Sequence, residues 1–306
     1  MRVVVLGAAA GGAFPQWNSN AQPCRRARSG DPFARSRTQA SIAVSADGRH
    51  WVLLNASPDL RQQIEQTPVL QPHEGLRSSP ITAVVLTGGD IDAIAGLLTL
   101  RERQAFSVLA TSRVHRVLDN NPIFEVLARG IVARQSLTLD MPFPVMLPDG
   151  RASGCIVTLF AVPGKVPLYL EQPGTTPALE ESDQTVGAAI SDGQTTLFYV
   201  PSCAAMTPGL ADRLRGAAAV FFDGTLWTDD EMVRAGLGPK TGQRMGHMSV
   251  SGSDGTLAAF AGLEVRRRIL LHINNSNPIL LDDSPECAEV AAAGWDVAYD
   301  GMELSL

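Results

Sequence analysis

Short apolar runs rich in β-branched residues alternate with segments of helical periodicity, and this alternation restricts the possible folds more than any other feature. The predicted strands are residues 3–6, 41–44, 51–54, 83–86, 155–161, 196–200, 220–222 and 268–271. The predicted helices are residues 94–103, 113–120, 122–133, 209–216, 229–235, 254–262 and 285–293. Strands that come first as a group and then mix with helices indicate an α/β sandwich, with sheets inside and helices outside.

Size and composition favour a soluble globular chain. With 306 residues, 45% of them hydrophobic and 18% charged, the sequence can build a large core, and we expect a single domain over 1–306. Residues 163–184 read as a long surface loop rather than a domain linker. The apolar start at residues 3–6 is too short for a signal peptide, and we find no stretch of about 20 apolar residues. We therefore predict a cytoplasmic protein without membrane insertion.

The charge and the cysteines exclude further classes. A net charge of -6 argues against nucleic-acid binding, which needs many Lys and Arg contacts to phosphate. The four cysteines lie far apart and form no C-x-x-C pair, so neither a disulfide framework nor a compact zinc knuckle is expected. We predict buried or idle thiols at Cys24, Cys155, Cys203 and Cys287.

The loop that follows the apolar run 81–86 has the layout of a metal-binding loop. Thr87, Asp92, Gly96 and Leu97 match the T-H-x-H-x-D-H-x-x-G-L pattern of the metallo-β-lactamase superfamily, whereas Gly88, Asp90 and Ala93 stand where that pattern has histidines. The alternative is that Asp90 and Asp92 are a turn residue and a helix cap before Ile94.

Motifs along most of the chain identify a narrower family. They are residues 11–18, 53–61, 96–102, 222–225, 245–248, 272–280, 283–286 and 298–302. In this order they resemble coenzyme PQQ synthesis protein B (PqqB). The resemblance implies an αββα sandwich of the metallo-β-lactamase-like type.

The same resemblance implies a role in the biosynthesis of pyrroloquinoline quinone (PQQ). The family is associated with iron- and O2-dependent hydroxylation of the tyrosine ring of a Glu-Tyr-derived precursor, so the chain is expected to be a non-haem iron oxygenase that uses Fe(II), with Zn possible in vitro. Its expected partner is a diglutamate-tyrosine type precursor or PQQ itself, and a homodimer is possible. The alternative is a metal-poor binding or carrier protein that aids transport of PQQ or its precursor to the periplasm. A metal-dependent phosphodiesterase is a third and weaker reading, because too few ligands remain for two metals.

Five residues carry the expected site. Asp90, Asp92 and His272 are the predicted metal ligands, since His272 matches the last metal-binding histidine of the superfamily and residues 90 and 92 project to one side of an extended segment. His247 and Asp223 are the predicted catalytic pair, with Asp223 as the acceptor that orients a histidine. The alternatives are a strand-end cap for His272 and a turn residue before Gly224 for Asp223.

Two other regions complete the prediction. PqqB-like chains commonly hold a structural zinc with W-N-C-x-C-x-x-C, but only Cys24 remains here, so no structural zinc is expected. The arginines between residues 25 and 37 either attract an acidic substrate or form a solvated loop. His50, His73 and His115 lie outside the matched motifs and are expected to face solvent.

Overall fold

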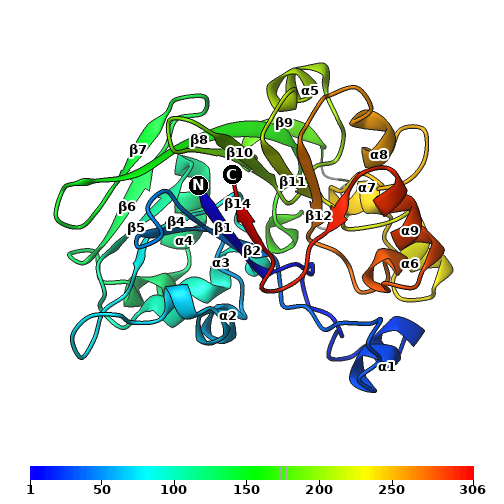
Figure 1. Ribbon diagram of the computed structural model, residues 1–306, viewed down its shortest axis with the longest axis horizontal. Coiled ribbons are helices and arrows are strands. Elements are labelled where there is room, and N and C mark those ends of the chain that lie inside the picture. Colours follow the sequence, from blue (N-terminus) through cyan, green and yellow to red (C-terminus); the bar gives the residue numbers. More distant parts are fainter. Residues whose placement is uncertain (173, 175, 177) are drawn as a thin grey trace.

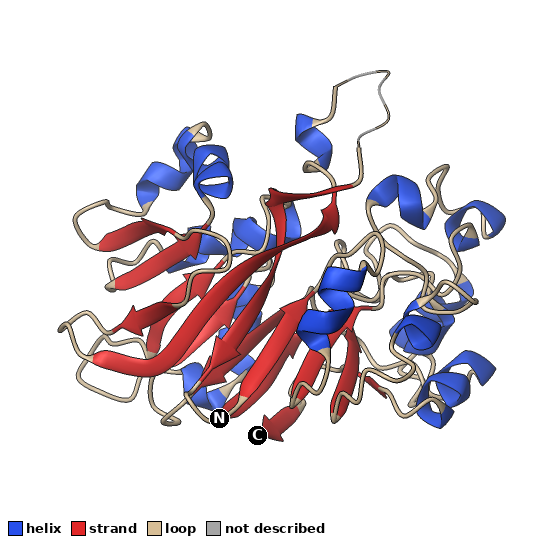
Figure 2. Cartoon of the chain, turned by 90° about the horizontal axis from the view of Figure 1, so that it is seen from above, coloured by secondary structure: helices blue, strands red, loops and turns tan. Residues whose placement is uncertain are grey.

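Two β-sheets pack face to face at the centre of the protein. The computed structural model describes residues 1–172, 174, 176 and 178–306. Each sheet has seven strands, and helices lie on the outer face of both (Figures 1 and 2). The α/β sandwich predicted from the alternation of strands and helices is therefore confirmed.

The first sheet mixes antiparallel and parallel pairing. Its order is β14 (Glu303–Ser305), β1 (Arg2–Gly7), β2 (Ser41–Ser45), β3 (Trp51–Leu54), β4 (Ile81–Val85), β5 (Phe106–Ala110) and β6 (Val132–Ser136). Strands β14 to β3 pair antiparallel, and β3 to β6 pair parallel. The parallel part places the carboxyl ends of β3, β4 and β5 at one edge, where ligands of α/β proteins usually bind.

The second sheet repeats this arrangement. Its order is β13 (Asp296–Val297), β12 (Arg267–Leu271), β11 (Ala219–Asp223), β10 (Thr196–Val200), β9 (Glu180–Ser191), β8 (Ala152–Gly164) and β7 (Phe143–Met146). Strands β13 to β10 pair parallel, whereas β10 to β7 pair antiparallel. The carboxyl ends of β10, β11 and β12 therefore also lie together.

The helices are short. They are α1 (Gln22–Arg28), α2 (Leu60–Gln66), α3 (Ile91–Ile94), α4 (Ser112–Asp119), α5 (Pro208–Leu214), α6 (Glu231–Arg234), α7 (Gly242–Met245), α8 (Thr256–Ala259) and α9 (Pro285–Ala292). Short 3-10 helices add Pro68–Leu70, Ala95–Leu100, Pro122–Val126, Leu168–Leu170 and Pro278–Leu280. Within the described residues, no helix combines the length and hydropathy that crossing a bilayer requires.

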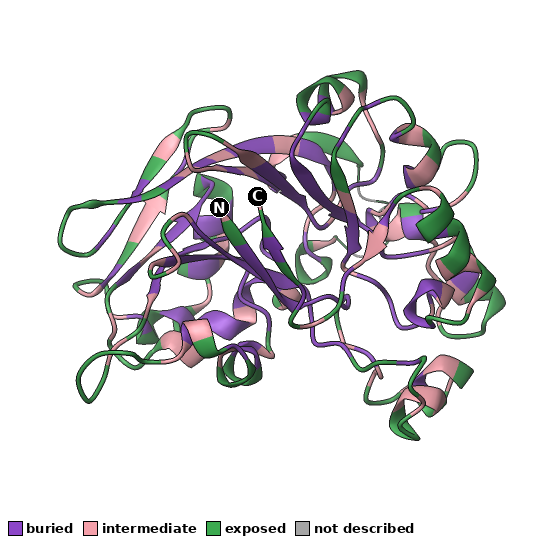
Figure 3. Ribbon diagram, in the orientation of Figure 1, coloured by how far each residue is buried: buried purple, intermediate pink, exposed green. Residues whose placement is uncertain are grey.

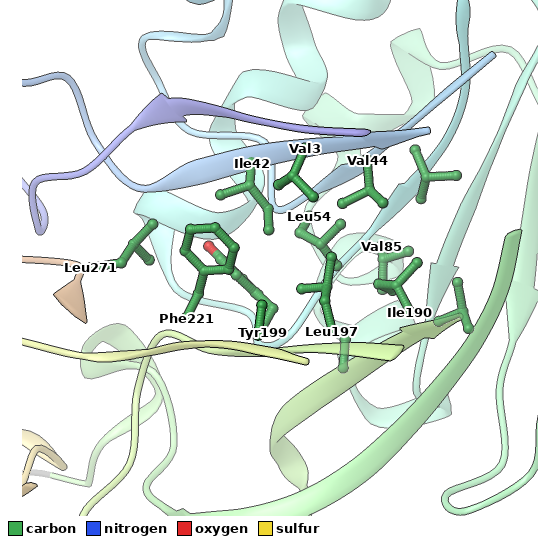
Figure 4. Packing of buried hydrophobic residues seen from close by; sticks show 14 of the residues in the cluster. Val3, Ile42, Val44, Leu54, Val85, Ile190, Leu197, Tyr199, Phe221 and Leu271 are labelled. Carbon is green, nitrogen blue, oxygen red and sulfur yellow. The ribbon is translucent and has the colours of Figure 1, made fainter. Parts of the chain in front are cut away.

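Three layers of apolar side chains hold the sandwich together. The middle layer lies between the sheets and joins residues such as Ile42 and Leu54 of the first sheet to Leu197 and Phe221 of the second (Figure 4). One outer layer packs α2, α3 and α4 on the first sheet, and the other packs α5 and α9 on the second. Buried residues are accordingly concentrated in the strands, while the solvent-facing sides of the helices are exposed (Figure 3). Because both faces of the central strands are covered, those strands read in the sequence as continuous apolar runs.

Several elements, among them α1, α2, β7, β13 and β14, were not predicted, and two predicted segments differ in the structure. Residues 122–133 were expected to form a helix, but only Pro122–Val126 makes a 3-10 turn and β6 begins at Val132. The helix cannot continue because Leu127 has a non-helical backbone with φ of -80° and ψ of 86°, and from Val132 onward the chain pairs with β5. The expected loop 163–184 is shorter at both ends, since β8 runs to Gly164 and β9 starts at Glu180. Residues 173, 175 and 177 of that loop lie outside the described residues.

Candidate metal centre

Strand ends from both sheets deliver the polar residues of the site. Asp223 is the last residue of β11, and His272 follows β12 directly. These two strands pair in parallel with Asp223 opposite Leu271, which sets Asp223 beside the start of the His272 loop. On the first sheet, Asp90 occupies the N-cap position of α3 without a capping hydrogen bond from its side chain, and Asp92 lies in the first turn, shortly after β4. The extended segment expected for residues 90 and 92 is therefore wrong, because a helix begins at Ile91. The helix-cap alternative for these two acids thus describes their backbone position.

Asp92 and His272 meet across the two sheets. The Nε2 atom of His272 lies 2.8 Å from Oδ2 of Asp92. Burial disfavours both charges, but the mutual hydrogen bond outweighs it: the pKa of His272 is raised and the pKa of Asp92 is lowered. His272 also has a left-handed backbone with φ of 58°, a conformation that costs conformational energy for residues other than glycine.

Thr225 connects this pair to a second one. The Nδ1 atom of His247 lies 2.7 Å from Oδ2 of the fully buried Asp223. The hydroxyl of Thr225 lies 2.6 Å from Oδ1 of Asp223, 3.1 Å from Nδ1 of His247 and 2.8 Å from Nδ1 of His272. The two imidazoles stack with ring centroids 5.2 Å apart. A hydroxyl that both donates and accepts fixes the orientation of both histidines.

These residues border a small cavity of about 120 Å³. Its lining comprises Ala40, Asn55, Thr87, Gly88, Asp90, Asp92, Ala93, Lys165, Thr185, Pro201, Ser202, Met245, His247 and His272. Asn55 and Thr87 support the lining by two hydrogen bonds, from Nδ2 of Asn55 to Oγ1 of Thr87 and from the Thr87 amide to Oδ1 of Asn55, each 2.9 Å. The cavity thus presents polar atoms that the protein itself holds in position.

Asp90 lines the same cavity but differs electrostatically from Asp92. Burial, followed by the negative charge of Asp92, raises the pKa of Asp90 to about 6. Gly88 lies beside it, and a Cβ at position 88 would be in ordinary van der Waals contact with Oδ2 of Asp90, at 3.7 Å. Asp90 therefore carries a carboxyl group to the place where the superfamily pattern has a histidine.

The donors present fit one divalent metal ion. Ligand atoms of Asp223, His247 and His272 all lie within 4.8 Å of one another, and Asp92 is in hydrogen-bond contact with His272. Two imidazoles with carboxylates on one side of a cavity suit Fe(II) or Zn(II), whereas softer metals prefer thiolates. Cys203 does not add to this set: its thiol is fully buried, its pKa is raised by burial, and Sγ donates to the Ala205 carbonyl.

All five residues expected from the sequence border or support one cavity, but sequence reasoning missed three others. Thr225 lies within the matched motif 222–225, and its position two residues after Asp223 is the signal that was available. Asn55 lies in the matched motif 53–61. For Lys165 the available signal was the rarity of its residue type, since the chain has only two lysines.

One sequence-based expectation outside the cavity is wrong. His115 was expected to face solvent but is buried in α4, with Nε2 3.0 Å from the Gln135 carbonyl, because α4 turns this side of the helix towards the sheet. The arginines between residues 25 and 37 are only partly paired with acids, because Arg25 and Arg28 are exposed and donate to backbone carbonyls. Arg26 pairs with Asp31 and Asp283, Arg35 pairs with Asp282, and Arg37 is buried.

Comparison with known proteins first defines the class. A family model described as a beta-lactamase superfamily domain matches residues 50–273. A diphosphatase of the PhnP family has the same fold, with a TM-score of 0.69 and 19% identity over 100% of this chain and 97% of that one. The chain thus belongs to the beta-lactamase superfamily, and the predicted αββα, metallo-β-lactamase-like fold is confirmed.

Full-length relatives then give the particular family. Coenzyme PQQ synthesis protein B of Gluconacetobacter diazotrophicus is 63% identical over 99% of both chains, and that of Xanthomonas campestris pv. campestris is 55% identical over 100% of both. The crystal structure of Zn(2+)-bound PqqB from Methylobacterium extorquens has a TM-score of 0.96 and 50% identity, again over 100% of both chains. The chain belongs to the coenzyme PQQ synthesis protein B family, as its sequence motifs predict.

Proposed function

We propose that this protein hydroxylates the tyrosine ring of a Glu-Tyr-derived precursor of PQQ in a reaction that depends on iron and O2. The observation that carries the proposal is the contact between Asp92 and His272 at a cavity that also holds the Asp223–His247 pair. Family membership supports the biosynthetic setting, and the grouping of His272 with Asp223 and His247, together with its contact to Asp92, supports a metal.

In this proposal His272 and Asp92 hold Fe(II), with Asp90 as a further carboxylate. Iron with histidine and carboxylate ligands and open positions supplies the oxidising power for inserting one oxygen atom of O2 into a ring C–H bond. The second oxygen atom leaves as water, with protons and an electron pair from an external reductant. Zn(II) would accept the same donors but has no redox chemistry.

The remaining residues orient groups and move protons. Asp223 accepts a hydrogen bond from Nδ1 of His247, which leaves Nε2 of that ring as the atom that can exchange a proton. Because His247 lines the cavity, it is suited to accept the phenol proton of a bound tyrosine ring. Asp223 itself is fully buried and acts through His247.

Reconstitution under anaerobic conditions tests the proposal. Protein loaded with Fe(II) is mixed with the dipeptide glutamyl-tyrosine, ascorbate and a pulse of O2, and the product is analysed by mass spectrometry. We expect a mass gain of one oxygen atom, O2 consumption that matches product, and loss of both in His272→Ala. Tight Fe(II) binding without any oxygenated product would contradict the proposal.

The metal-poor carrier is the second candidate, and the cationic side chain of Lys165 in the cavity favours it. A carrier needs affinity for the acidic ligand but no redox centre. Calorimetry with PQQ and with glutamyl-tyrosine on metal-free protein separates the two candidates. Binding that is equally tight with and without metal, together with no oxygenation, selects the carrier.

A further inference from the structure

The cavity contains one buried cation for which the iron chemistry has no use. Lys165 follows β8, lines the cavity together with His247 and His272, and keeps only 11% of its side chain exposed. A lysine loses favourable hydration when it is buried this far, so such burial usually accompanies a fixed partner and often a function. Glu171 is the fixed partner here.

Glu171 holds two cations at once. Oε1 of Glu171 lies 2.9 Å from Nζ of Lys165, and Oε2 lies 2.6 Å from Nη2 of Arg244. The Glu171 side chain is 8% exposed, and the hydrogen bond from Arg244 lowers its pKa to about 2. Two positive groups share one negative group, so this cluster keeps one excess positive charge next to the cavity.

Lys165 is also fixed from the backbone side. Oγ1 of Thr185 donates to the Lys165 carbonyl at 3.0 Å, and Thr185 lines the cavity as well. Gly246 makes room for the aliphatic stem, because a Cβ at that position would lie 3.2 Å from Cγ of Lys165. These contacts fix the position of the ammonium group at the cavity that His247 also lines, before any ligand binds.

Donor counting leaves one hydrogen of the ammonium group available. A lysine ammonium has three N–H donors. Within the part of the chain that the structure describes, two of them are used, by Oε1 of Glu171 and by the Val166 carbonyl at 3.1 Å. The third can serve a ligand in the cavity.

We propose that Lys165 binds a carboxylate of the substrate, with Glu171 and Arg244 holding its ammonium group in place. This inference rests on the proposed function for the substrate class, a small molecule that carries both a phenol ring and carboxylates. A chain of net charge -6 with Asp90, Asp92 and Asp223 at the site otherwise repels such a ligand. Lys165 is a binding residue that sets specificity, and Glu171 and Arg244 are positioning residues.

The competing explanation is that Lys165 only balances the charge of Asp90. Under that explanation, loss of the lysine affects every ligand of the cavity alike. Under ours, loss of the lysine removes the preference for a carboxylate over an amide. The comparison of acid and amide probes therefore distinguishes the two explanations.

The experiment is anaerobic calorimetry with glutamyl-tyrosine and its two single amides, glutaminyl-tyrosine and glutamyl-tyrosinamide. The variants are Lys165→Met, Lys165→Arg and the matched control Lys240→Met, which changes the only other lysine. We expect the wild type to bind the acid about 10- to 100-fold more tightly than one of the amides, as a charge-assisted hydrogen bond requires. Lys165→Met loses this ratio, Lys165→Arg keeps part of it, and Lys240→Met keeps all of it.

Several outcomes overturn the inference. They are equal affinity of the wild type for the acid and both amides, equal weakening of acid and amide by Lys165→Met, or no binding of any probe. The wild-type comparison needs no variant, so it stands even when Lys165→Met does not fold. Because binding is measured without O2, a preserved acid preference in a protein that never oxygenates its ligand overturns only the enzymatic proposal.

Discussion

His272 and Asp92 are 180 residues apart in the sequence, yet their Nε2 and Oδ2 atoms lie 2.8 Å apart. His272 follows β12 of one sheet, and Asp92 lies in the helix that follows β4 of the other. The contact therefore depends on the apolar layer between the sheets, which sets their separation. Small shifts of either sheet are expected to act on this pair first.

Removal of the Asp92 carboxylate tests the centre most directly. Asp92→Asn replaces a charged ligand oxygen by an amide and removes the carboxylate that contacts Nε2 of His272. We expect Fe(II) or Zn(II) affinity to fall at least about 10-fold, measured by calorimetry under anaerobic conditions. The exposed Asp254→Asn serves as the control and is expected to bind as the wild type does. Unchanged affinity in Asp92→Asn would remove this residue from the ligand set.

Thr225 is expected to matter through the two histidines that it orients. Thr225→Val removes the hydroxyl next to both Nδ1 atoms and next to the buried Asp223, whereas Thr225→Ser keeps it. We expect metal affinity to fall about 10- to 100-fold in the valine variant. Loss of a donor to a buried carboxylate should also cost about 1–3 kcal/mol of unfolding free energy. The serine variant should recover most of both losses, and equal behaviour of the two variants would speak against the hydroxyl.

Gly96 is required by a close backbone contact. A Cβ at this position would lie 2.1 Å from the Ser57 carbonyl oxygen, and the Gly96 amide donates to the Ala56 carbonyl at 2.8 Å. Gly96→Ala should therefore destabilise the fold by about 3 kcal/mol or more in urea denaturation. Gly130→Ala is the matched control, because no described atom lies within 4 Å of its added Cβ. Equal midpoints for the two variants would refute the contact.

The buried carboxyl group of Asp300 is expected to make the stability of the fold depend on pH. Its Oδ2 accepts hydrogen bonds from the amide and the hydroxyl of Thr38, each 2.7 Å, while burial raises its pKa to about 6 from 3.8. Between these values the folded chain keeps a proton that the unfolded chain releases, so this group lowers stability as pH rises from about 4 to about 6. The loss is about 3 kcal/mol and is complete above pH 6 or so.

Asp300→Asn should remove that part of the pH dependence. The amide oxygen still accepts from Thr38, but no buried charge forms. Urea unfolding at about pH 4 and about pH 7 measures the difference, with the exposed Asp212→Asn as control. A wild-type slope retained in Asp300→Asn would assign the pH dependence to other groups.

Cys24 is expected not to hold zinc. Its fully buried thiol lies 3.7 Å from Oδ1 of Asn275, which gives the sulfur a hydrogen-bond partner in place of a metal. We expect Cys24→Ser to leave the zinc content of purified protein unchanged, as determined by elemental analysis. Loss of one equivalent of zinc in this variant would establish a second metal site.

The strand pattern made the fold predictable. The type and the bounds of individual elements were harder to predict. Buried parallel strands such as β11 and β12 are continuous apolar runs, and their carboxyl ends had to lie together at one edge. Residues 122–133 were predicted as one helix because they have helical periodicity, whereas the helical part ends at Val126 and pairing with β5 begins at Val132. Similarly, the burial of His115 depends on which side of α4 faces the sheet.

The candidate site was predictable in its residues but not in its connections. Motif positions indicated Asp92 and His272 separately, and their contact follows from the packing of two sheets. The roles of Thr225 and Lys165 depend on side-chain geometry that no spacing encodes. Charge counting around residues 25–37 was incomplete, because two of the acids that pair with these arginines, Asp282 and Asp283, lie some 250 residues further along the chain.

The division of the site between the two sheets has a consequence for folding. Asp90 and Asp92 come from the half of the chain that builds most of the first sheet, while Asp223, His247 and His272 come from the half that builds the second. A metal held by Asp92 and His272 would bind only after both halves have docked, and its binding free energy would then resist their separation. The metal content per mole of protein would thus measure the fraction of correctly assembled molecules in a preparation.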